Sequence, residues 1–443
     1  MQSRARTRFL TEVWSKYPAA EAGWLDVPDF NEAQKAEAVV CGRLSITDGS
    51  MKIFSAGSEI EFSFQSSDLK WLSPQKSPDT PSPELFTNGD ILALDISRKG
   101  TKHTASGVLL LCPAPENESS PNRSANRFGV QESMRWAAFT DAIRNHFTSK
   151  KFIEVLTPTL VPSPGTEPFL DPFRTIWELG SKKIELFLPT SPEFHLKKLL
   201  SRGWTKIFEM KSCFRNGEIG EHHQPEFTML EWYRAYSNLD AIAKDVEELL
   251  SDLAKRFRSS TVSVERTTMK KLFKEHLDFD LRPETSLEDL RALAAKSGIE
   301  ISVDDTWNDV FFRVFLEKIE RSLGLNAPCI VSGYPPSQAA LSRIGRDGFS
   351  ERFEVYWRGL EIANAFHELN DPSENRKRFN EDAIQKAELG KPGVPIDEEL
   401  MTDLQSGMPP SGGIALGVDR LFMALFEINE IGNTRAFPLT RPC

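Results

Sequence analysis

The stretch FRNGEIGEHHQPEFTMLEWY, residues 214–233, is the most informative part of this chain of 443 residues. It joins an Arg at a strand end to a Pro-Glu-Phe turn and then to an acidic, aromatic strand. An Arg can pair with a phosphate, a Phe can stack on a base, and a Glu with a Tyr hydroxyl can hold an ammonium group. These residue types suit ATP and a cationic substrate. A buried amphipathic hairpin with a surface Arg would carry the same pattern.

Two further segments favour a binding site over a plain hairpin. Residues 188–200, LPTSPEFHLKKLL, place Ser191-Pro192-Glu193 at the start of a predicted helix, where free N–H groups favour an anion. Downstream, GLEIANAFHELNDP at 359–372 is followed by SGGIALGVDRLFMALF at 411–426. The latter predicts a glycine-rich strand that runs into a helix near an Arg.

In this order the segments resemble motifs 2 and 3 of the class II aminoacyl-tRNA synthetases, and in detail the lysyl branch of that family. Motif 1 also has a counterpart, because a helical pattern over 134–147 leads to FIEVLTPTL with Pro158 at the strand end. The resemblance covers about residues 130–443, and four motifs in the family's order argue against chance agreement. Motif 1 implies a homodimer formed through residues 134–158.

Within the lysyl branch, the chain looks like the ligases that attach (R)-β-lysine to elongation factor P, on the segments SPEFHLKKLL, PEFTMLEWY, RFEVYWRGLEIANAFHEL and GIALGVDRL. The resemblance implies that ATP and Mg²⁺ are used to activate lysine or (R)-β-lysine as an aminoacyl-adenylate. Transfer to a lysine side chain of elongation factor P would follow. One alternative is a lysyl-tRNA synthetase that aminoacylates tRNA.

A second alternative belongs to another class of protein: an inactive paralogue that serves as a binding or regulatory module. Such a paralogue is expected to have lost its catalytic residues. The chain retains the four residues that matter most in the family pattern, Arg215, Glu361, Glu368 and Arg420. Their presence argues for an active enzyme.

Composition agrees with a globular enzyme of more than one domain. With 40% hydrophobic and 27% charged residues, the chain can bury a large core. A formal net charge of −10 argues against strong nonspecific binding to nucleic acid. The five cysteines stand apart from one another, which gives no zinc spacing. The start MQSRARTRFL has no following apolar run, and no stretch reaches the length of a membrane span, so we expect a cytoplasmic protein.

The domain organisation is read from a polar, turn-rich segment at 113–127, PAPENESSPNRSANR, which predicts a linker. Before it, five short β-rich runs without a helical crossover predict a small all-β barrel resembling an OB-fold over 1–112. After it, helix and strand patterns alternate without a βαβ rhythm. They predict an α+β class II synthetase domain on an antiparallel sheet over 128–443, with a helical insertion at 239–325.

The barrel bears on which acceptor the enzyme uses. In lysyl-tRNA synthetases an N-terminal OB-fold reads the anticodon, so tRNA is an alternative partner through this domain. Phe54, Phe62 and Phe64 can stack on bases, but alternating aromatics in strands are more often core residues. The ligases that the chain resembles typically lack such a barrel, whereas lysyl-tRNA synthetases usually have a longer connection before motif 1.

The expected ATP contacts follow from the charge that develops during the reaction. Activation of a carboxylate by ATP places extra negative charge on the α-phosphate, so the site needs fixed cations. The resemblance assigns Arg215 to the α-phosphate and Arg420 to the γ-phosphate, as the catalytic residues, and assigns Phe227 to stacking on the adenine. The other implied ATP-binding residues are Asn216, Gly217, Glu218, His223, Gln224, Glu361, Ile362 and Gly417.

Two of these positions differ from the family pattern. Gln224 replaces a usual Asn, and Gly217 lacks the carboxylate often found at its position, for which Glu218 would substitute. The glycines that precede motif 3, Gly412, Gly413 and Gly417, permit a close approach of the backbone to a nucleotide.

The metal assignment rests on Glu354 and Glu361, which in the family bind magnesium that bridges the phosphates. Carboxylate oxygens are suitable ligands for that ion. The interval of seven residues puts the two side chains on opposite faces of one continuous strand. They can converge only if a turn or a bulge intervenes, which Gly359 permits.

The amino-acid pocket is expected to bind a diamine that also carries a carboxylate. The resemblance assigns Glu368 and Tyr233 to the distal ammonium, Glu193 and Glu231 to the other amine, and Asn364 to the carboxylate. Three acids around one small ligand suit a dication, because a neutral amino acid would leave them unpaired. The rest of the expected pocket consists of Ser191, Pro192, Phe366 and Ala415.

Two pocket positions bear on the choice between α- and β-lysine. Lysyl-tRNA synthetases generally carry Ala-Pro-Glu and a Gly where this chain has Ser191-Pro192-Glu193 and Ala415. Both differences match the β-lysine ligases. A methyl group in place of a glycine hydrogen would shift discrimination by about 1–3 kcal/mol.

Overall fold

The structure is a computed structural model that describes residues 24–47, 50–65, 69–72, 81–114 and 129–439. The chain divides into two compact units, Met1–Met134 and Arg135–Cys443. All but the first two residues of the predicted linker at 113–127 lie outside the described residues, and the domain limits stay a prediction. Within the described ranges, none of the helices has the length and apolar character needed to cross a membrane.

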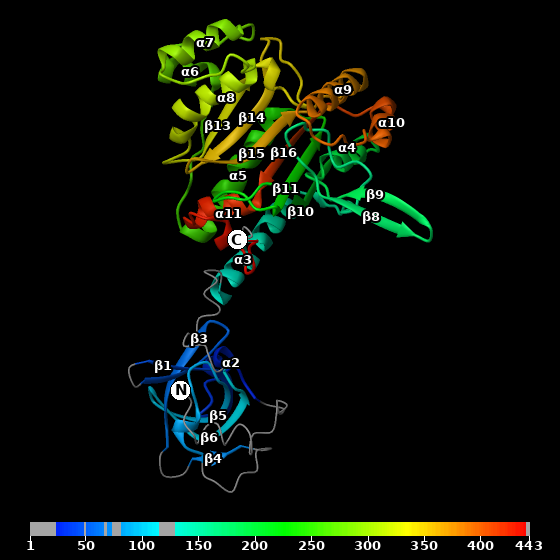
Figure 1. Ribbon diagram of the computed structural model, residues 1–443. Helices are drawn as coiled ribbons and strands as arrows, with labels where there is room; N and C mark the ends of the chain where they lie inside the picture. Colours follow the sequence, from blue (N-terminus) through cyan, green and yellow to red (C-terminus); the bar gives the residue numbers. More distant parts are fainter. Residues whose placement is uncertain (1–23, 48–49, 66–68, 73–80, 115–128, 440–443) are drawn as a thin grey trace. The chain divides into compact units, whose positions relative to one another are not determined.

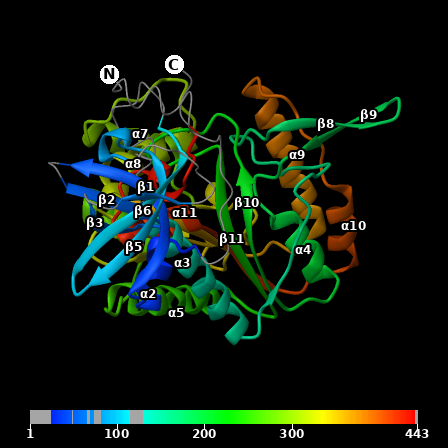
Figure 2. The ribbon, with the colours of Figure 1, turned by 90° about the horizontal axis from the view of Figure 1, so that it is seen from below.

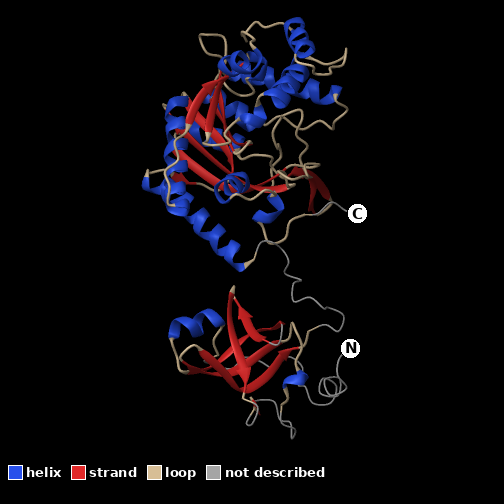
Figure 3. Ribbon diagram, turned by 90° about the vertical axis from the view of Figure 1, so that its left-hand side faces the viewer, coloured by secondary structure: helices blue, strands red, loops and turns tan. Residues whose placement is uncertain are grey.

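The N-terminal unit contains a β-barrel, whose curved strands are seen in Figure 3. Its strands pair in the order β3-β2-β1-β5-β6-β4, and β3 also pairs in parallel with β6. This extra pairing closes the sheet on itself, and it confirms the prediction of an OB-like barrel. The strands are β1 (Glu37–Thr47), β2 (Ser50–Ser55), β3 (Ser58–Phe64), β4 (Lys70–Trp71), β5 (Ile91–Lys99) and β6 (Lys102–Cys112), with a short helix η2 (Pro83–Leu85).

Aromatic and aliphatic side chains fill the barrel. Helix α2 (Val27–Ala33) begins at Asp26, whose carboxylate accepts a hydrogen bond from the Asp29 backbone at 2.9 Å, and it contributes Phe30 to the core. Phe62 is buried, and the Phe64 ring lies 5.3 Å from it. Phe54 is 42% exposed. Two of the three aromatics that could have stacked on bases therefore belong to the core, and Phe54 presents its ring to solvent.

The second unit is built on a sheet of eight strands in the order β12-β13-β14-β15-β16-β11-β10-β7 (Figure 1). The pairings from β13 to β10 are antiparallel, and only the edge pairs β12–β13 and β10–β7 are parallel. This confirms the α+β prediction. The strands are β7 (Ile153–Glu154), β10 (Lys206–Phe214), β11 (Glu226–Ala235), β12 (Glu265–Thr268), β13 (Cys329–Tyr334), β14 (Ser350–Trp357), β15 (Leu360–His367) and β16 (Ser411–Gly417).

Helices surround this sheet, and a separate hairpin of β8 (Arg174–Leu179) and β9 (Lys182–Phe187) projects from the unit (Figures 1 and 2). Helices α5 and α11 pack against the central strands, while α6, α7 and α8 form a second core cluster together with residues of β13 and β14. The helices are α3 (Val130–Ser149), α4 (Glu193–Ser201), α5 (Leu239–Arg258), α6 (Met269–Leu277), α7 (Leu287–Lys296), α8 (Trp307–Lys318), α9 (Pro372–Glu388), α10 (Glu398–Ser406) and α11 (Val418–Phe426), with short helices η3 (Glu320–Ser322), η4 (Pro336–Gln338) and η5 (Ile431–Thr434).

The side chains of β11 point alternately to the two faces of the sheet, one apolar and one polar. Trp232 is buried, and its ring lies 5.0 Å from Phe147 of α3. Because successive side chains of a strand point to opposite faces, Glu231 and Tyr233 point away from this aromatic core. The helical face of the sheet is therefore apolar, and the opposite face carries polar groups.

Candidate functional site

A cavity of about 1210 Å³ opens over the polar face of the large sheet. Its size exceeds the roughly 300–1,000 Å³ of typical small-molecule sites, so it can hold more than one ligand. Most of the residues selected from the sequence line it, namely Ser191, Glu193, Arg215, Glu218, His223, Gln224, Phe227, Tyr233, Glu361, Ile362, Asn364, Phe366, Glu368, Ala415, Gly417 and Arg420. Those that do not are Pro192, Asn216, Gly217, Glu231 and Glu354. For both sets, the roles toward ligands remain predictions.

The strand register assembles the pocket from distant parts of the chain. Glu231 of β11 pairs with Ala415 of β16, which pairs with Asn364 of β15, which in turn pairs with Glu354 of β14. Residues paired across neighbouring strands share one face of the sheet. Four predicted site residues therefore form a row across the sheet, although up to 184 positions separate them in the sequence.

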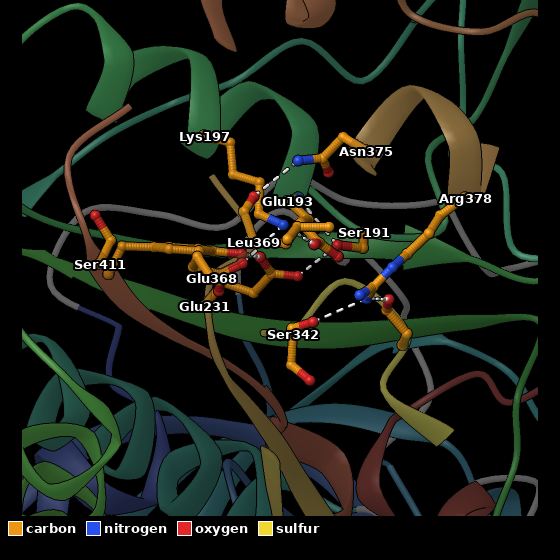
Figure 4. Close-up of polar contacts among 12 residues, drawn as sticks. Ser191, Glu193, Lys197, Glu231, Ser342, Glu368, Leu369, Asn375, Arg378 and Ser411 are labelled. Carbon is orange, nitrogen blue, oxygen red and sulfur yellow. Dashed lines mark hydrogen bonds and ion pairs between the residues drawn. The ribbon is translucent and has the colours of Figure 1, made fainter. Parts of the chain in front are cut away.

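A buried Lys that the sequence analysis missed lies among the acids (Figure 4). The Lys197 Nζ is 2.6 Å from Glu193 Oε1 and 2.7 Å from Glu368 Oε2, and Lys197 and Glu368 are both fully buried. The signal that could have revealed it is the spacing of four residues between Glu193 and Lys197 on α4, which places both on one helix face. The pairing with Glu368 is set by the fold.

Hydroxyl groups hold the third acid in place. The Ser191 hydroxyl donates to Glu231 Oε1 at 2.5 Å, and the Tyr233 hydroxyl donates to Glu231 Oε2 at 3.1 Å. Burial and the charge of Glu193 raise the pKa of Glu231 well above its ordinary value, although both hydroxyls oppose this rise. Glu231 thus lies beneath the cavity wall and supports the Ser and Tyr that face the cavity.

The electrostatics of this pocket favour a cationic ligand. Burial raises the pKa of Glu368 to about 7, the Lys197 ammonium opposes this rise, and Glu193 adds to it. Burial alone would lower the pKa of Lys197, but Glu193 and Glu368 outweigh it and hold the ammonium charged. Lys197 offsets one of the two acids that it contacts, so Glu193 and Glu368, when both are ionised, leave one negative charge for a ligand to neutralise.

The absence of a side chain at Gly413 makes the acid pocket possible. A Cβ there would collide with Glu368 Oε1 and with the Tyr233 ring. At Gly412 a Cβ would collide with Ile242 and with the backbone of Asn238 on the helical face. These two glycines therefore make room for protein atoms, whereas the sequence analysis had assigned them to the approach of a nucleotide. Gly417 lines the cavity.

Two guanidinium groups give the cavity a cationic region. The Arg215 guanidinium lies 5.1 Å from the centre of the Phe227 ring, and its buried Nε has no hydrogen-bond partner within the described parts of the chain. The Arg420 guanidinium donates to the Glu361 carbonyl at 2.8 Å and to His223 Nε2 at 2.6 Å. Burial and the two nearby Arg charges lower the pKa of His223 to about 4, so its neutral ring can accept this bond.

The two adjacent residues of motif 3, Asp419 and Arg420, have different roles. Asp419 is buried and accepts hydrogen bonds from the Thr228 backbone at 2.6 Å and from the Thr434 hydroxyl at 3.0 Å. It thus ties α11 to the start of β11, while its neighbour Arg420 faces the cavity. Gln224 exchanges two hydrogen bonds with the Leu439 backbone, at 3.0 and 3.3 Å, and so holds the segment that follows η5.

The predicted metal residues lie on adjacent strands of a hairpin. Arg358 and Gly359 form its turn with positive φ values of 55° and 73°, and a β-bulge follows Val355. The expectation that a turn or bulge separates Glu354 from Glu361 is confirmed. Glu354 accepts hydrogen bonds from Tyr334 at 2.6 Å, from Tyr356 at 2.5 Å and from Arg352.

The donor set at this place fits an ion that is shared with a ligand. Burial and the charge of Glu354 raise the pKa of Glu361 to about 7, against the opposing charge of Arg420. A divalent cation would offset this repulsion between two carboxylates. Over the described residues, no group of three or more His, Cys, Asp or Glu side chains gathers to bind a metal. Magnesium commonly needs only one or two carboxylates when substrate phosphates supply further oxygens.

Comparisons with known proteins agree with this geometry. Residues 128–441 match the family described as tRNA synthetases class II (D, K and N). Among curated relatives, the elongation factor P–(R)-β-lysine ligase of Hamiltonella defensa subsp. Acyrthosiphon pisum (strain 5AT) is 34% identical over 317 residues. Those of Proteus mirabilis (strain HI4320) and Klebsiella pneumoniae (strain 342) are 36% identical over 318 and 319 residues. Each match covers 70% of this chain and 96% of the relative.

The buried Lys gives a first prediction. Lys197→Met would leave Glu193 and Glu368 buried without their shared cation, so we expect the free energy of unfolding to fall by about 3–5 kcal/mol. Lys377 is 64% exposed and lies 3.9 Å from Glu374, so Lys377→Met should cost less than about 1 kcal/mol. Guanidinium unfolding of both variants measures the difference. Equal losses would show that the buried triad does not stabilise the pocket.

Proposed function

Because this chain belongs to the class II tRNA synthetase family (D, K and N), we propose that it is an ATP-dependent ligase that activates lysine or (R)-β-lysine and transfers it to a lysine side chain of elongation factor P. The observation that carries the proposal is the pocket in which Glu193 and Glu368 hold Lys197, with Glu231 beneath it bonded to Ser191 and Tyr233. The negative charge that Lys197 leaves uncompensated suits an ammonium group of a diamino acid. The names of the relatives support the acceptor.

In the first step the lysine carboxylate attacks the α-phosphate of ATP, and pyrophosphate leaves. Arg215 and Arg420 supply fixed positive charge for the negative charge that develops, at no cost of reorganisation. The Arg215 side chain lines the cavity, so its guanidinium can donate to a phosphate oxygen. Phe227 carries the Arg215 guanidinium against its ring and offers the adenine a surface to stack on.

Magnesium would be held by Glu354 and Glu361 together with phosphate oxygens, and when bound it would neutralise phosphate charge. The remaining contacts to ATP assigned from the sequence come from the loop between β10 and β11, from β15 and from the start of α11. His223 is neutral and fixed by Arg420, so its position depends on the same Arg that is assigned to the γ-phosphate.

The amino acid is oriented by acidic groups at its amines and by a neutral amide at its carboxylate. Glu368 and Tyr233 are assigned to the distal ammonium, and Glu193 with Glu231 to the other amine. Asn364 accepts a hydrogen bond from Arg352 Nε at 3.0 Å through its amide oxygen, so its NH₂ group stays directed at the cavity and can donate to the substrate carboxylate. The Ala415 methyl group lies in the row that joins Glu231 to Asn364.

The OB-like barrel supports one alternative, in which the acceptor is tRNA. Phe54 is exposed on that barrel and could stack on a base. The inactive-paralogue alternative is opposed by the cavity, since the retained Arg and Glu side chains converge on it. The proposed acceptor is a translation factor, so we assign the reaction to the cytoplasm.

The function is tested by transfer of labelled α-lysine or (R)-β-lysine in a mixture with ATP, magnesium, elongation factor P and total tRNA. We expect label on elongation factor P, with more from β-lysine than from α-lysine. Label on tRNA from α-lysine would instead identify a lysyl-tRNA synthetase. If neither amino acid supported exchange of pyrophosphate into ATP, the protein would be an inactive paralogue, and both enzyme hypotheses would be wrong.

The pKa of Glu368 predicts how the amino acid binds as pH changes. An ammonium group is held by the ionised carboxylate, so affinity for lysine should rise as the pH increases through about 7, the value to which burial raises the pKa of Glu368. Glu368→Gln should weaken lysine binding by about 1.5–3 kcal/mol, remove this pH dependence, and leave ATP binding intact. Calorimetry with each ligand at several pH values measures this, with the exposed Glu388→Gln as control. Parallel loss of ATP binding would contradict the assignment.

A homodimer through the motif 1 region is also proposed. The segment after α3 exposes large apolar side chains to solvent. Ile153 is 53% exposed, Leu156 is 92% exposed and Leu160 is 53% exposed. Such a patch marks an interaction site. Light scattering should find a particle of two chains, and Leu156→Glu should shift it to one chain. Leu389→Glu, a change at another exposed Leu, should leave the dimer intact. A monomeric wild type would refute this part of the proposal.

A further inference from the structure

Glu167, an acidic residue of the cavity wall, has no part in the activation step described above. Glu167 lies in the connection between β7 and β8, and it lines the cavity together with Glu193 and Arg215. These two neighbours are assigned to opposite ends of the aminoacyl-adenylate, Glu193 to the amine and Arg215 to the α-phosphate. The carbonyl carbon of that intermediate lies between its amine and its phosphate.

The backbone that carries Glu167 is held on both sides. The buried Lys386 of α9 donates to the carbonyl oxygens of Glu167 at 3.2 Å and of Leu170 at 2.6 Å. The Thr166 hydroxyl donates to Asp382 Oδ2 at 2.8 Å, on the same helix. A segment joined to one helix by three hydrogen bonds can present a side chain in a defined position.

The carboxylate of Glu167 occupies a space that a missing side chain provides. Gly165 has a φ of 123°, and a Cβ built on it would lie 2.6 Å from Glu167 Oε2 and 3.2 Å from the Thr190 hydroxyl. Thr190 immediately precedes Ser191 of the amine pocket, and its hydroxyl donates to the Pro164 carbonyl at 3.0 Å. The carboxylate is therefore folded back toward the pocket.

We propose that Glu167 is a catalytic carboxylate of the second step, which binds the ammonium group of the acceptor lysine and takes a proton from it. This inference rests on the proposed function and deepens it. The acceptor nitrogen must reach the carbonyl carbon between Glu193 and Arg215, where Glu167 already lies within electrostatic reach of both. An unmodified lysine has a pKa of about 10.4 and so arrives protonated.

The step balances without a further reactant. Glu167 accepts one proton from the ammonium nitrogen, which frees its lone pair. The lone pair forms the C–N bond, and the bond between the carbonyl carbon and the AMP oxygen breaks, so AMP leaves with that electron pair. The second proton of the nitrogen passes to water, and the amide remains.

The charges around Glu167 suit a proton acceptor. Burial and the charge of Glu193 on α4 raise its pKa above the ordinary value, and Asp382 on α9 acts in the same direction. Arg215, from the turn after β10, opposes them. Lys386 also faces this segment from α9, with its own pKa lowered by burial. A carboxyl group that binds protons more tightly is the stronger base toward an ammonium.

The test separates activation from transfer in the full-length Glu167→Gln variant. Exchange of pyrophosphate into ATP reports adenylate formation, and hydroxylamine traps the adenylate with an amine that is already neutral. We expect both to be unchanged. Transfer to elongation factor P and to Nα-acetyl-lysine should fall by about 10²–10⁴-fold. The transfer rate that remains should rise more steeply with pH than the wild-type rate, because only amine deprotonated in solution can then react.

Glu381→Gln is the matched control, since Glu381 lines the same cavity, is exposed, and loses the same charge. It should behave as wild type in all assays. Equal loss of exchange, hydroxamate formation and transfer in Glu167→Gln would overturn the proposal in favour of a structural role, and so would unchanged transfer. Wild-type transfer to tRNA alone would overturn the proposed acceptor as well, because a ribose hydroxyl carries no ammonium.

Discussion

The ammonium of Lys197, buried between Glu193 and Glu368, is the interaction on which the amine pocket depends. Two carboxylates in a dry environment repel each other, and burial raises the pKa of Glu368. One internal cation reduces this repulsion without cancelling the charge of the whole pocket. The remaining negative charge is then available to a cationic ligand. The same three side chains therefore determine both whether the pocket is stable and which ligands it favours.

The cavity as a whole has its acidic side chains at one end and its guanidinium groups at the other. The acids lie where α4 meets β11 and the end of β15, and the two guanidiniums lie at the turn after β10 and at the start of α11. An aminoacyl-adenylate has a matching distribution, with amines at one end and phosphate at the other. Between them, Glu167 is held by α9 and by the space over Gly165. The flat face of an antiparallel sheet allows these groups to stand side by side.

The two units of the chain differ in how their aromatics are used. In the barrel, Phe62 and Phe64 pack together in the core. Their rings stabilise the closed sheet. In the larger unit, Phe147 and Trp232 anchor the helical face, while Phe227 stays on the cavity side beneath Arg215. The alternation of strand side chains produces both results, because each strand must bury one face before the other can carry chemistry.

The sequence by itself determined the barrel, the antiparallel sheet, and the Arg and Glu positions that converge on the cavity. Strand alternation and turn residues act over a few neighbouring residues, so they can be read from one chain, and the Arg and Glu positions follow from the resemblance of the motifs to the class II family. Only the tertiary structure decided that Lys197 pairs with Glu368, that Gly413 makes room for Tyr233, and that Glu167 faces the cavity. Strand register and loop anchoring bring these residues together, and both depend on contacts between segments that are far apart in the sequence.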